Sequence, residues 1–292
     1  MVRTAACLLV LLAVPACAAE APLPLDLRVL SRAPVPGEPL RVVVRSAEPL
    51  ASLTVRLLDR DVFMSRFGSE DGAEIWTGWG IVDLTQEPTT STVDAHGVTE
   101  SGREAIGSRA FVVEAKEFPV ENLSVSGKYV TPSPEAEARL AEEREKLAGV
   151  YASRSPIPPL AAPFARPVPG EPTSVFGTRR LFNGKPRDPH PGLDLRAATG
   201  TSVAASGPGR IVLAQDLYYS GNTVIVDHGG GLFTLYAHLS ELRVREGQIV
   251  ATGEAVGLSG ATGRVTGPHL HWGAKIGDRP FDPRALLDPA LF

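Results

Sequence analysis

The stretch Gly267-Pro268-His269-Leu270-His271-Trp272 decides how the C-terminal half of this chain is interpreted. Side chains two apart on a β-strand point to the same face, so a strand that begins here aims His269 and His271 at one point. Gly267 and Pro268 shape the entry of the chain into that strand. The sequence therefore predicts a strand over Leu270–Lys275, with His271 on it and His269 just before it facing the same point.

Glycine-punctuated strands precede this one from about residue 167 onward. They are predicted over Ser202–Ala205, Gly209–Ala214, Asn222–Asp227 and Phe233–His238. Their spacing leaves no room for crossover helices, which parallel strands require. Residues 167–292 are therefore predicted to form an antiparallel all-β domain.

Five of the six histidines lie between His190 and His271. A catalytic zinc site uses three protein ligands from His and Asp or Glu, and His190, Asp194 and His271 satisfy that rule. His238 and His269 then remain to act as general base or as hydrogen-bond donors to an oxyanion. A histidine four residues before an aspartate, or two histidines two apart, often occurs by chance among the polar residues of loops and strands. The prediction therefore depends on the order and spacing of all the motifs together.

Several ordered motifs give the C-terminal half a family likeness. They are Phe176-Gly177-Thr178-Arg179-Arg180, His190 to Asp194, Val224 to Gly229, Tyr236-Ala237-His238-Leu239 and Gly267 to Trp272. Over about Pro167 to Leu287 the chain resembles the lysostaphin-type (LytM-domain) zinc metalloendopeptidases, which cut peptide cross-links in bacterial cell walls.

The resemblance implies one Zn²⁺ per chain, with peptidoglycan as the substrate. It implies His190, Asp194 and His271 as zinc ligands and His238 and His269 as catalytic residues. Two alternatives stay open: a catalytically silent binding module or activator of cell-wall amidases, and a latent peptidase whose groove is covered by the front domain or by residues 155–172. Silent members of the family have typically lost one of these residues, and none is missing here.

Residues 23–128 show short alternating runs separated by Pro and Gly turns, which predict an immunoglobulin-like β-sandwich. Exported members of the family can carry such a domain and a helical spacer. Trp76 and Trp79 are expected in the sandwich core, because large aromatic side chains mostly pack. His96 is expected in an exposed loop. No catalytic constellation is visible in this half.

A helix and a proline-rich linker are predicted over residues 129–166. Ser133 and Pro134 are typical of an N-cap and a first helical residue, and Glu135 to Tyr151 is rich in helix formers. The pairs Glu135 with Arg139 and Glu142 with Lys146 have favourable i,i+4 orientation. Leu140, Leu147 and Val150 form a narrow apolar stripe that predicts docking on a neighbouring domain.

Residues 1–19 are typical of an export signal, with Arg3 before the apolar run Ala5 to Val14. Two cleavage patterns remain open. Ala16-Cys17-Ala18 fits ordinary signal peptidase, whereas Val14-Pro15-Ala16-Cys17 resembles a lipobox, with an untypical proline, in which Cys17 would carry a lipid anchor. The protein is therefore expected in the periplasm or cell envelope. At most one cysteine remains after cleavage, so no disulfide is predicted.

Charge excludes one partner class. The formal net charge is -4, with basic and acidic residues interspersed, which gives no positive electrostatic field to attract nucleic acid.

His228, beside three glycines, is assigned a structural role at a turn. Arg179, Arg180 and Arg187 are expected to be solvated, with contact to substrate carboxylates as the alternative. The oligomeric state and the bond cut are not specified by the sequence.

Overall fold

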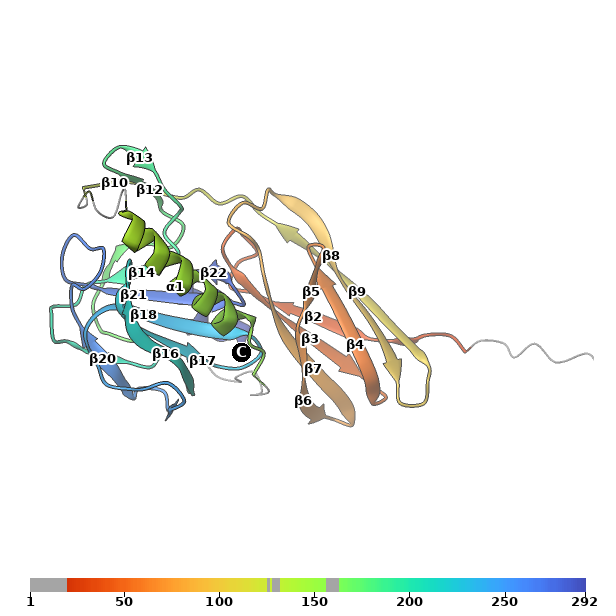
Figure 1. Cartoon of the computed structure of the whole chain (residues 1–292). Coiled ribbons are helices and arrows are strands. Elements are labelled where there is room, and N and C mark those ends of the chain that lie inside the picture. The colour runs from red at the N-terminus through yellow and green to blue at the C-terminus, as the bar shows by residue number, and fades with distance from the viewer. Residues whose placement is uncertain (1–19, 125–126, 128–131, 156–162) are drawn as a thin grey trace, which may run out of the picture.

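The structure of the protein is a computed structural model, which describes residues 20–124, 127, 132–155 and 163–292. Two β-rich parts lie side by side, and a helix lies on the C-terminal part (Figure 1). The expected export signal with Cys17, and most of the proline-rich linker, fall outside the described residues. Within the described residues, no helix combines the length and the apolar character that crossing a membrane requires.

The front part is a β-sandwich of two sheets. One sheet has the order β1 (Leu23–Pro24), β9 (Glu104–Val113), β8 (Thr89–Thr99), β4 (Leu50–Leu57) and β5 (Arg60–Val62). The other has the order β2 (Asp26–Leu30), β3 (Pro39–Ser46), β7 (Ala73–Ile81) and β6 (Met64–Glu70). The side chains facing inward from both sheets form one apolar core, as a sandwich requires.

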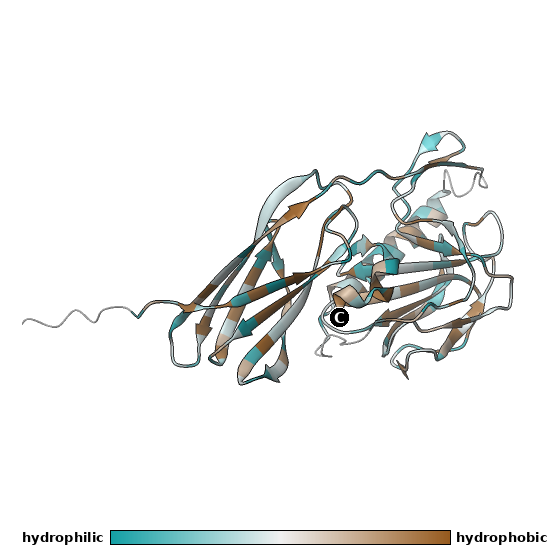
Figure 2. Ribbon diagram, turned by 180° about the vertical axis from the view of Figure 1, so that it is seen from behind, coloured by the Kyte–Doolittle hydropathy of each residue, from teal (hydrophilic) through white to brown (hydrophobic). Residues whose placement is uncertain are grey.

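Alternation along the strands produces this core. Leu40, Val42 and Val44 of β3 are fully buried, and Figure 2 shows apolar and polar residues alternating along several of the front strands. The same alternation places His96 on β8 rather than in the expected loop, because Ala95 and Gly97 on either side face inward. His96 is exposed, as expected, but it lies on a regular strand that pairs on both sides.

The predicted boundary of the front domain at residue 128 does not match the strand pairing. β10 (Val120–Leu123) lies before that boundary, yet it pairs in parallel with β12 (Arg179–Phe182) of the C-terminal part, and β13 (Lys185–Pro186) completes this small sheet. Long-range pairing of this kind leaves no local signal in the sequence. The chain therefore enters the C-terminal part before the helix begins.

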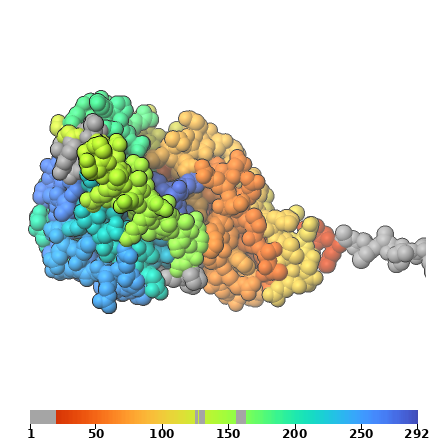
Figure 3. All heavy atoms as spheres, viewed as in Figure 1, coloured from red at the N-terminus to blue at the C-terminus, as the bar shows by residue number. Residues whose placement is uncertain are grey.

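The helix α1 (Pro134–Ala152) begins as predicted, with Ser133 as N-cap accepting a hydrogen bond from the Ala136 amide. Its apolar side packs on the C-terminal sheet. Tyr151 is buried against Phe233, with ring centroids 5.4 Å apart, and Leu147 and Val150 pack on the same cluster. The predicted apolar stripe therefore docks on a neighbouring domain, and Figure 3 shows α1 lying across it.

The ion pairs of α1 differ from those predicted within the helix. Arg139 pairs with Glu143 at 2.7 Å and with Asp216 at 2.8 Å. Lys146 pairs with Glu246 at 3.1 Å. Both basic side chains reach residues of the C-terminal domain, so they support docking of the helix as well as the helix itself.

The C-terminal domain is the predicted antiparallel all-β domain. The main path of its large sheet runs β11 (Pro172–Ser174), β14 (Gly192–Leu195), β21 (Leu270–Ile276), β18 (Leu232–Leu242), β17 (Gly221–Asp227), β16 (Gly209–Leu217) and β19 (Ile249–Val250). Off this path, β20 (Ala255–Ser259) pairs with β18 and with β15 (Ser202–Ala204), and β22 (Arg279–Phe281) pairs with β21. The short 3-10 helices η2 (Pro283–Leu287) and η3 (Pro289–Leu291) close the chain.

The two parts share a packed interface. Trp79 is buried, as expected, but it lies at this interface rather than in the sandwich core, with its ring 6.0 Å from the ring of Phe292. Arg279 on β22 donates to Asp83 at 2.7 Å beside it. Trp76 is half-buried and packs against the sandwich core. The C-terminus thus ties the two parts together (Figure 1).

Candidate metal centre

Two neighbouring strands bring three of the sequence-predicted residues to one point. β14 pairs with β21 so that Asp194 lies directly opposite His271, and His190 comes just before β14. His190 Nε2 lies 3.0 Å from Asp194 Oδ1 and 3.0 Å from His271 Nδ1. The third side of this triangle, from His271 Nδ1 to Asp194 Oδ1, is 2.8 Å. Three potential ligand atoms therefore converge.

The atoms behind this triangle fix the orientation of two of its members. His190 Nδ1 lies 3.1 Å from the carbonyl oxygen of Val175, to which it donates as a neutral ring, so its Nε2 lone pair faces the triangle. Arg180 donates to Asp194 Oδ2 at 2.7 Å, which turns Oδ1 toward the histidines. Two imidazole nitrogens and one carboxylate oxygen suit a divalent cation such as zinc, and the donor set fits it.

The ionisation of these groups agrees with that donor set. Burial lowers the pKa of His190 to about 4, against the favourable charge of Asp194, so its ring is neutral. Burial also disfavours the charged form of Asp194. The close contacts of Asp194 with His190 and His271 outweigh that effect and hold the pKa of Asp194 well below its usual range. His190 thus presents a neutral ring and Asp194 an ionised carboxylate, which are the metal-binding forms of these two groups.

Gly192 makes room for one ligand. A Cβ atom on Gly192 would lie 2.7 Å from Cε1 and 2.8 Å from Nε2 of His271, and 2.6 Å from the carbonyl oxygen of Trp272. His271 therefore lies directly against bare backbone on the neighbouring strand. Only glycine leaves that space, which the sequence-based argument did not single out.

His238 and His269 lie beside the triangle. His238 Nδ1 is 2.9 Å from the carbonyl oxygen of Thr262, and His269 Nδ1 is 2.8 Å from that of Gly267. With Nδ1 donating to these carbonyl oxygens, the Nε2 atom of each ring remains available to the site, and the two ring centroids are 4.9 Å apart. Burial, followed by the charges of His271 and His269, lowers the pKa of His238 to about 3.

The backbone of His238 is unusual. Its φ of 64° lies in the left-handed region, which is costly for a residue with a side chain. The strand pairing is also irregular between β17 and β18 at this point, and the His238 amide bonds to Ser220. A bulge thus turns the His238 ring toward His269 and His271.

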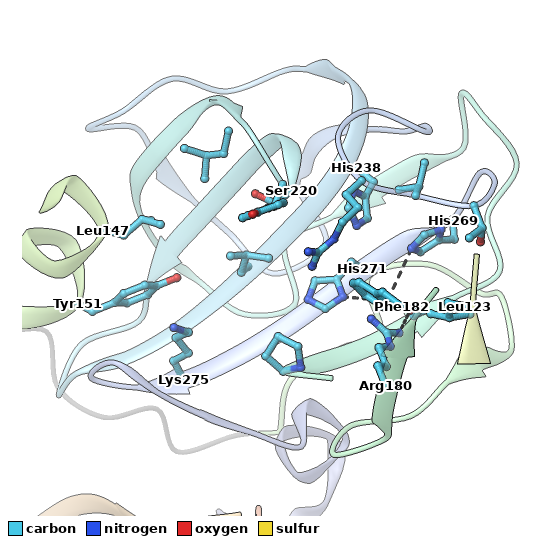
Figure 4. Close-up of a pocket in the computed structure, with 18 residues that line it drawn as sticks. Leu123, Leu147, Tyr151, Arg180, Phe182, Ser220, His238, His269, His271 and Lys275 are labelled. Carbon is cyan, nitrogen blue, oxygen red and sulfur yellow. Dashed lines mark hydrogen bonds and ion pairs between the residues drawn. The ribbon is translucent and has the colours of Figure 1, made fainter. Parts of the chain in front are cut away.

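A cavity of about 300 Å³ contains these side chains and extends along the sheet to α1. Figure 4 shows His238, His269 and His271 in one part of it, and Lys275 and Tyr151 in the part next to α1. Among the described residues that line it, Leu123 of β10 falls within residues 23–128, the predicted front domain, and none comes from the sandwich strands β1 to β9. The segment 163–172 contributes none either, so the described residues do not show the covering considered for a latent peptidase.

Two other expectations had different outcomes. His228 lies outside the site: its ring is buried between the Pro208 carbonyl oxygen at 2.7 Å and Thr234 Oγ1 at 2.8 Å, consistent with a structural role. Arg180 was expected to be solvated, which is wrong, because its side chain is 14% exposed and is paired with Asp194. Arg180 is the last residue of the motif Phe176 to Arg180, and membership of that motif was its sequence signal.

The chain is similar to known peptidases over its C-terminal domain. Residues 188–283 match peptidase family M23. The chain is 45% identical over 109 residues to the peptidoglycan DD-endopeptidase ShyA of Vibrio cholerae, covering 37% of this chain and 25% of that protein. It is 44% identical over 100 residues to the DD-carboxypeptidase/endopeptidase Mpg of Neisseria meningitidis, covering 34% of this chain and 23% of that protein. The chain thus spans about a quarter of the length of these relatives.

A solved structure resembles nearly the whole chain. The crystal structure of a Pseudomonas aeruginosa protein described as an M23 peptidase superimposes with a TM-score of 0.65 at 29% identity, covering 89% of this chain and 96% of that one. Both the front part and the C-terminal domain are therefore included in the likeness.

Proposed function

Since the chain carries a peptidase domain of family M23, we propose that it is a zinc-dependent endopeptidase that hydrolyses peptide bonds in peptidoglycan stems or cross-links. The observation that carries the proposal is the convergence of His190, Asp194 and His271 in an open cavity, with His238 and His269 beside them. The relatives ShyA, a peptidoglycan DD-endopeptidase, and Mpg, a DD-carboxypeptidase/endopeptidase, support the choice of substrate.

In the proposed mechanism, His190, Asp194 and His271 hold the metal. A bound zinc ion would supply a Lewis acid for the scissile carbonyl and lower the pKa of a nearby water. His238 and His269 act on protons, since both offer an Nε2 atom whose ring is oriented by a backbone carbonyl. One of them accepts the proton of the attacking water at Nε2, and the other, with a proton on Nε2, donates a hydrogen bond to the developing oxyanion.

The location of this activity follows from the substrate. Peptidoglycan lies outside the cytoplasmic membrane, and residues 1–19 are typical of an export signal. We therefore place the protein in the periplasm or cell envelope. A lipid anchor at Cys17 would hold it at a membrane surface.

The test is hydrolysis of purified cross-linked muropeptides by the mature protein, with bound zinc measured in the same sample. The proposal expects release of monomers that stops with a chelator and returns with zinc. His269→Ala should keep the zinc and lose most of the hydrolysis. If the wild type binds zinc with all five residues intact and releases nothing, even after the front domain is removed, the silent binding module is the better description.

A further inference from the structure

Lys275 lies on the same face of β21 as His271. The two residues are four apart on a regular strand, so their side chains point the same way. At ~3.3 Å per residue, they are separated by about 13 Å along the sheet. Both line the same cavity, and Figure 4 shows Lys275 in the part of it next to Tyr151 of α1. A peptide bound at the metal ligands and extended along β21 would reach Lys275.

The ammonium group of Lys275 has unused hydrogen-bonding capacity. Within the described part of the chain, Nζ donates one hydrogen bond, to the backbone oxygen of Asp278 at 3.2 Å, and lies 4.2 Å from the centroid of the Tyr151 ring. Lysine carries three donors. Among the described residues, no carboxylate forms an ion pair with it, and burial lowers its pKa against the opposing charge of Asp278. A carboxylate from a ligand would relieve that desolvated charge.

The surroundings of Lys275 favour an anion. The described side chains lining the cavity include three cations, Arg180, Arg264 and Lys275, and one carboxylate, Asp194. Arg180 already pairs with Asp194, and Arg264 stacks on the rings of Phe182 and Tyr219. Lys275 differs from both arginines. Among the described residues it has no carboxylate partner, and it lies over one aromatic ring, that of Tyr151, instead of two.

Apolar side chains around Lys275 strengthen this preference. Leu147 and Tyr151 come from α1, and Leu217 and Leu235 come from the sheet beneath it. Apolar walls exclude water and lower the local dielectric, which makes a charged contact stronger than it is at an open surface. These walls depend on the docked position of α1.

We propose that the end of the cavity next to α1 is a carboxylate-binding subsite, in which Lys275 holds an acidic group of the substrate. The acidic group lies about four residues along an extended chain from the bond to be cut, the distance set by β21. This inference rests on the proposed function and adds to it a substrate class: stem peptides with a free carboxylate at that distance.

The experiment compares two probes on the full-length mature protein: cross-linked muropeptides with free carboxylates, and the same muropeptides amidated with carbodiimide and ammonia. Wild type should cleave the free form with a KM lower by about tenfold, the discrimination typical of one charge-assisted contact. In Lys275→Met that ratio should fall to about one, with kcat on the amidated probe unchanged. Lys275→Arg should restore most of it.

Lys146→Met is the matched control, because it removes the same charge from α1 at a site paired with Glu246, away from the cavity. It should leave the preference intact. Unchanged zinc content and unchanged cleavage of the amidated probe show that Lys275→Met is folded. If Lys275→Met keeps the full preference for free carboxylates, the subsite is overturned.

Equilibrium binding separates this inference from the proposed function. If wild type cleaves neither probe, calorimetric titration with the same two probes still decides the matter. Tighter binding of the free form that depends on Lys275 supports the subsite in a protein that is not a peptidase. Equal binding of both forms by wild type and Lys275→Met refutes it.

Discussion

Gly192→Ala should disable the metal centre without removing a ligand. The new methyl group would lie 2.6 Å from the Trp272 carbonyl oxygen and 2.7 Å from Cε1 of His271. Ordinary contact begins at 3.4 Å, so the neighbouring strand must move by about 0.8 Å. The carbonyl belongs to a paired strand and cannot rotate aside. β14 and β21 carry Asp194 and His271, so any separation of these strands pulls two ligands apart.

The expected loss of zinc affinity follows from how little displacement of its ligands a metal site tolerates. Ligand distances are held within about 0.2 Å, well below the displacement required here. We expect zinc affinity to fall by about 10- to 100-fold and the free energy of unfolding by about 1–3 kcal/mol. Gly192 has no positive φ, so the cause is packing alone.

Gly273→Ala is a control at the residue directly opposite Gly192. A Cβ atom there would meet Leu235 at 3.5 Å and His271 Nε2 at 3.8 Å, both ordinary contacts. The assay is competition for zinc with a chromogenic chelator, together with urea unfolding of each variant. Gly273→Ala should match wild type in both. Wild-type zinc affinity in Gly192→Ala would refute the packing argument.

Four further substitutions test the roles of the two catalytic histidines, His228 and Trp79. His238→Ala and His269→Ala should each keep bound zinc and slow muropeptide hydrolysis by about 10²- to 10⁴-fold, and loss of zinc would contradict their placement beyond the metal. Burial lowers the pKa of His228 to about 4, so between pH 6.5 and 4 the unfolded chain binds the extra proton and stability falls as pH falls. His228→Gln should remove about 3 kcal/mol of that pH dependence in urea unfolding, and an equally steep dependence would count against the buried neutral ring. Trp79→Ala should cost about 3–5 kcal/mol and hasten proteolysis between the two parts, whereas unchanged cleavage would mean that the interface does not depend on it.

Much of the fold was predictable because its signals are local. Ser133 and Pro134 mark the start of α1 through capping chemistry, and the C-terminal strands follow from alternation between glycine turns. The pairing of β10 with β12 was not predictable, since it joins segments more than fifty residues apart. The place of Trp79 was missed for the same kind of reason: its burial follows from hydrophobicity, but the domain that buries it does not.

The residues of the site also fall into those that local sequence patterns predict and those that depend on contacts between strands. The two-residue spacing predicted that His269 and His271 face one point, and their ring nitrogens lie 3.7 Å and 2.8 Å from Asp194 Oδ1. The motif order selected His190 and Asp194. Arg180 and Gly192 act through contacts with a neighbouring strand. An arginine in a polar loop and a glycine in a glycine-rich domain have many ordinary explanations, so their roles emerge only from distances.

The measurement that tests the central claim most directly is the zinc content of the purified mature protein and of His271→Ala, determined by atomic emission beside muropeptide hydrolysis. The account predicts about one zinc per wild-type chain with hydrolysis, and loss of both in His271→Ala. A wild type without zinc that still hydrolyses muropeptides would contradict it, and so would a His271→Ala variant that retains its metal.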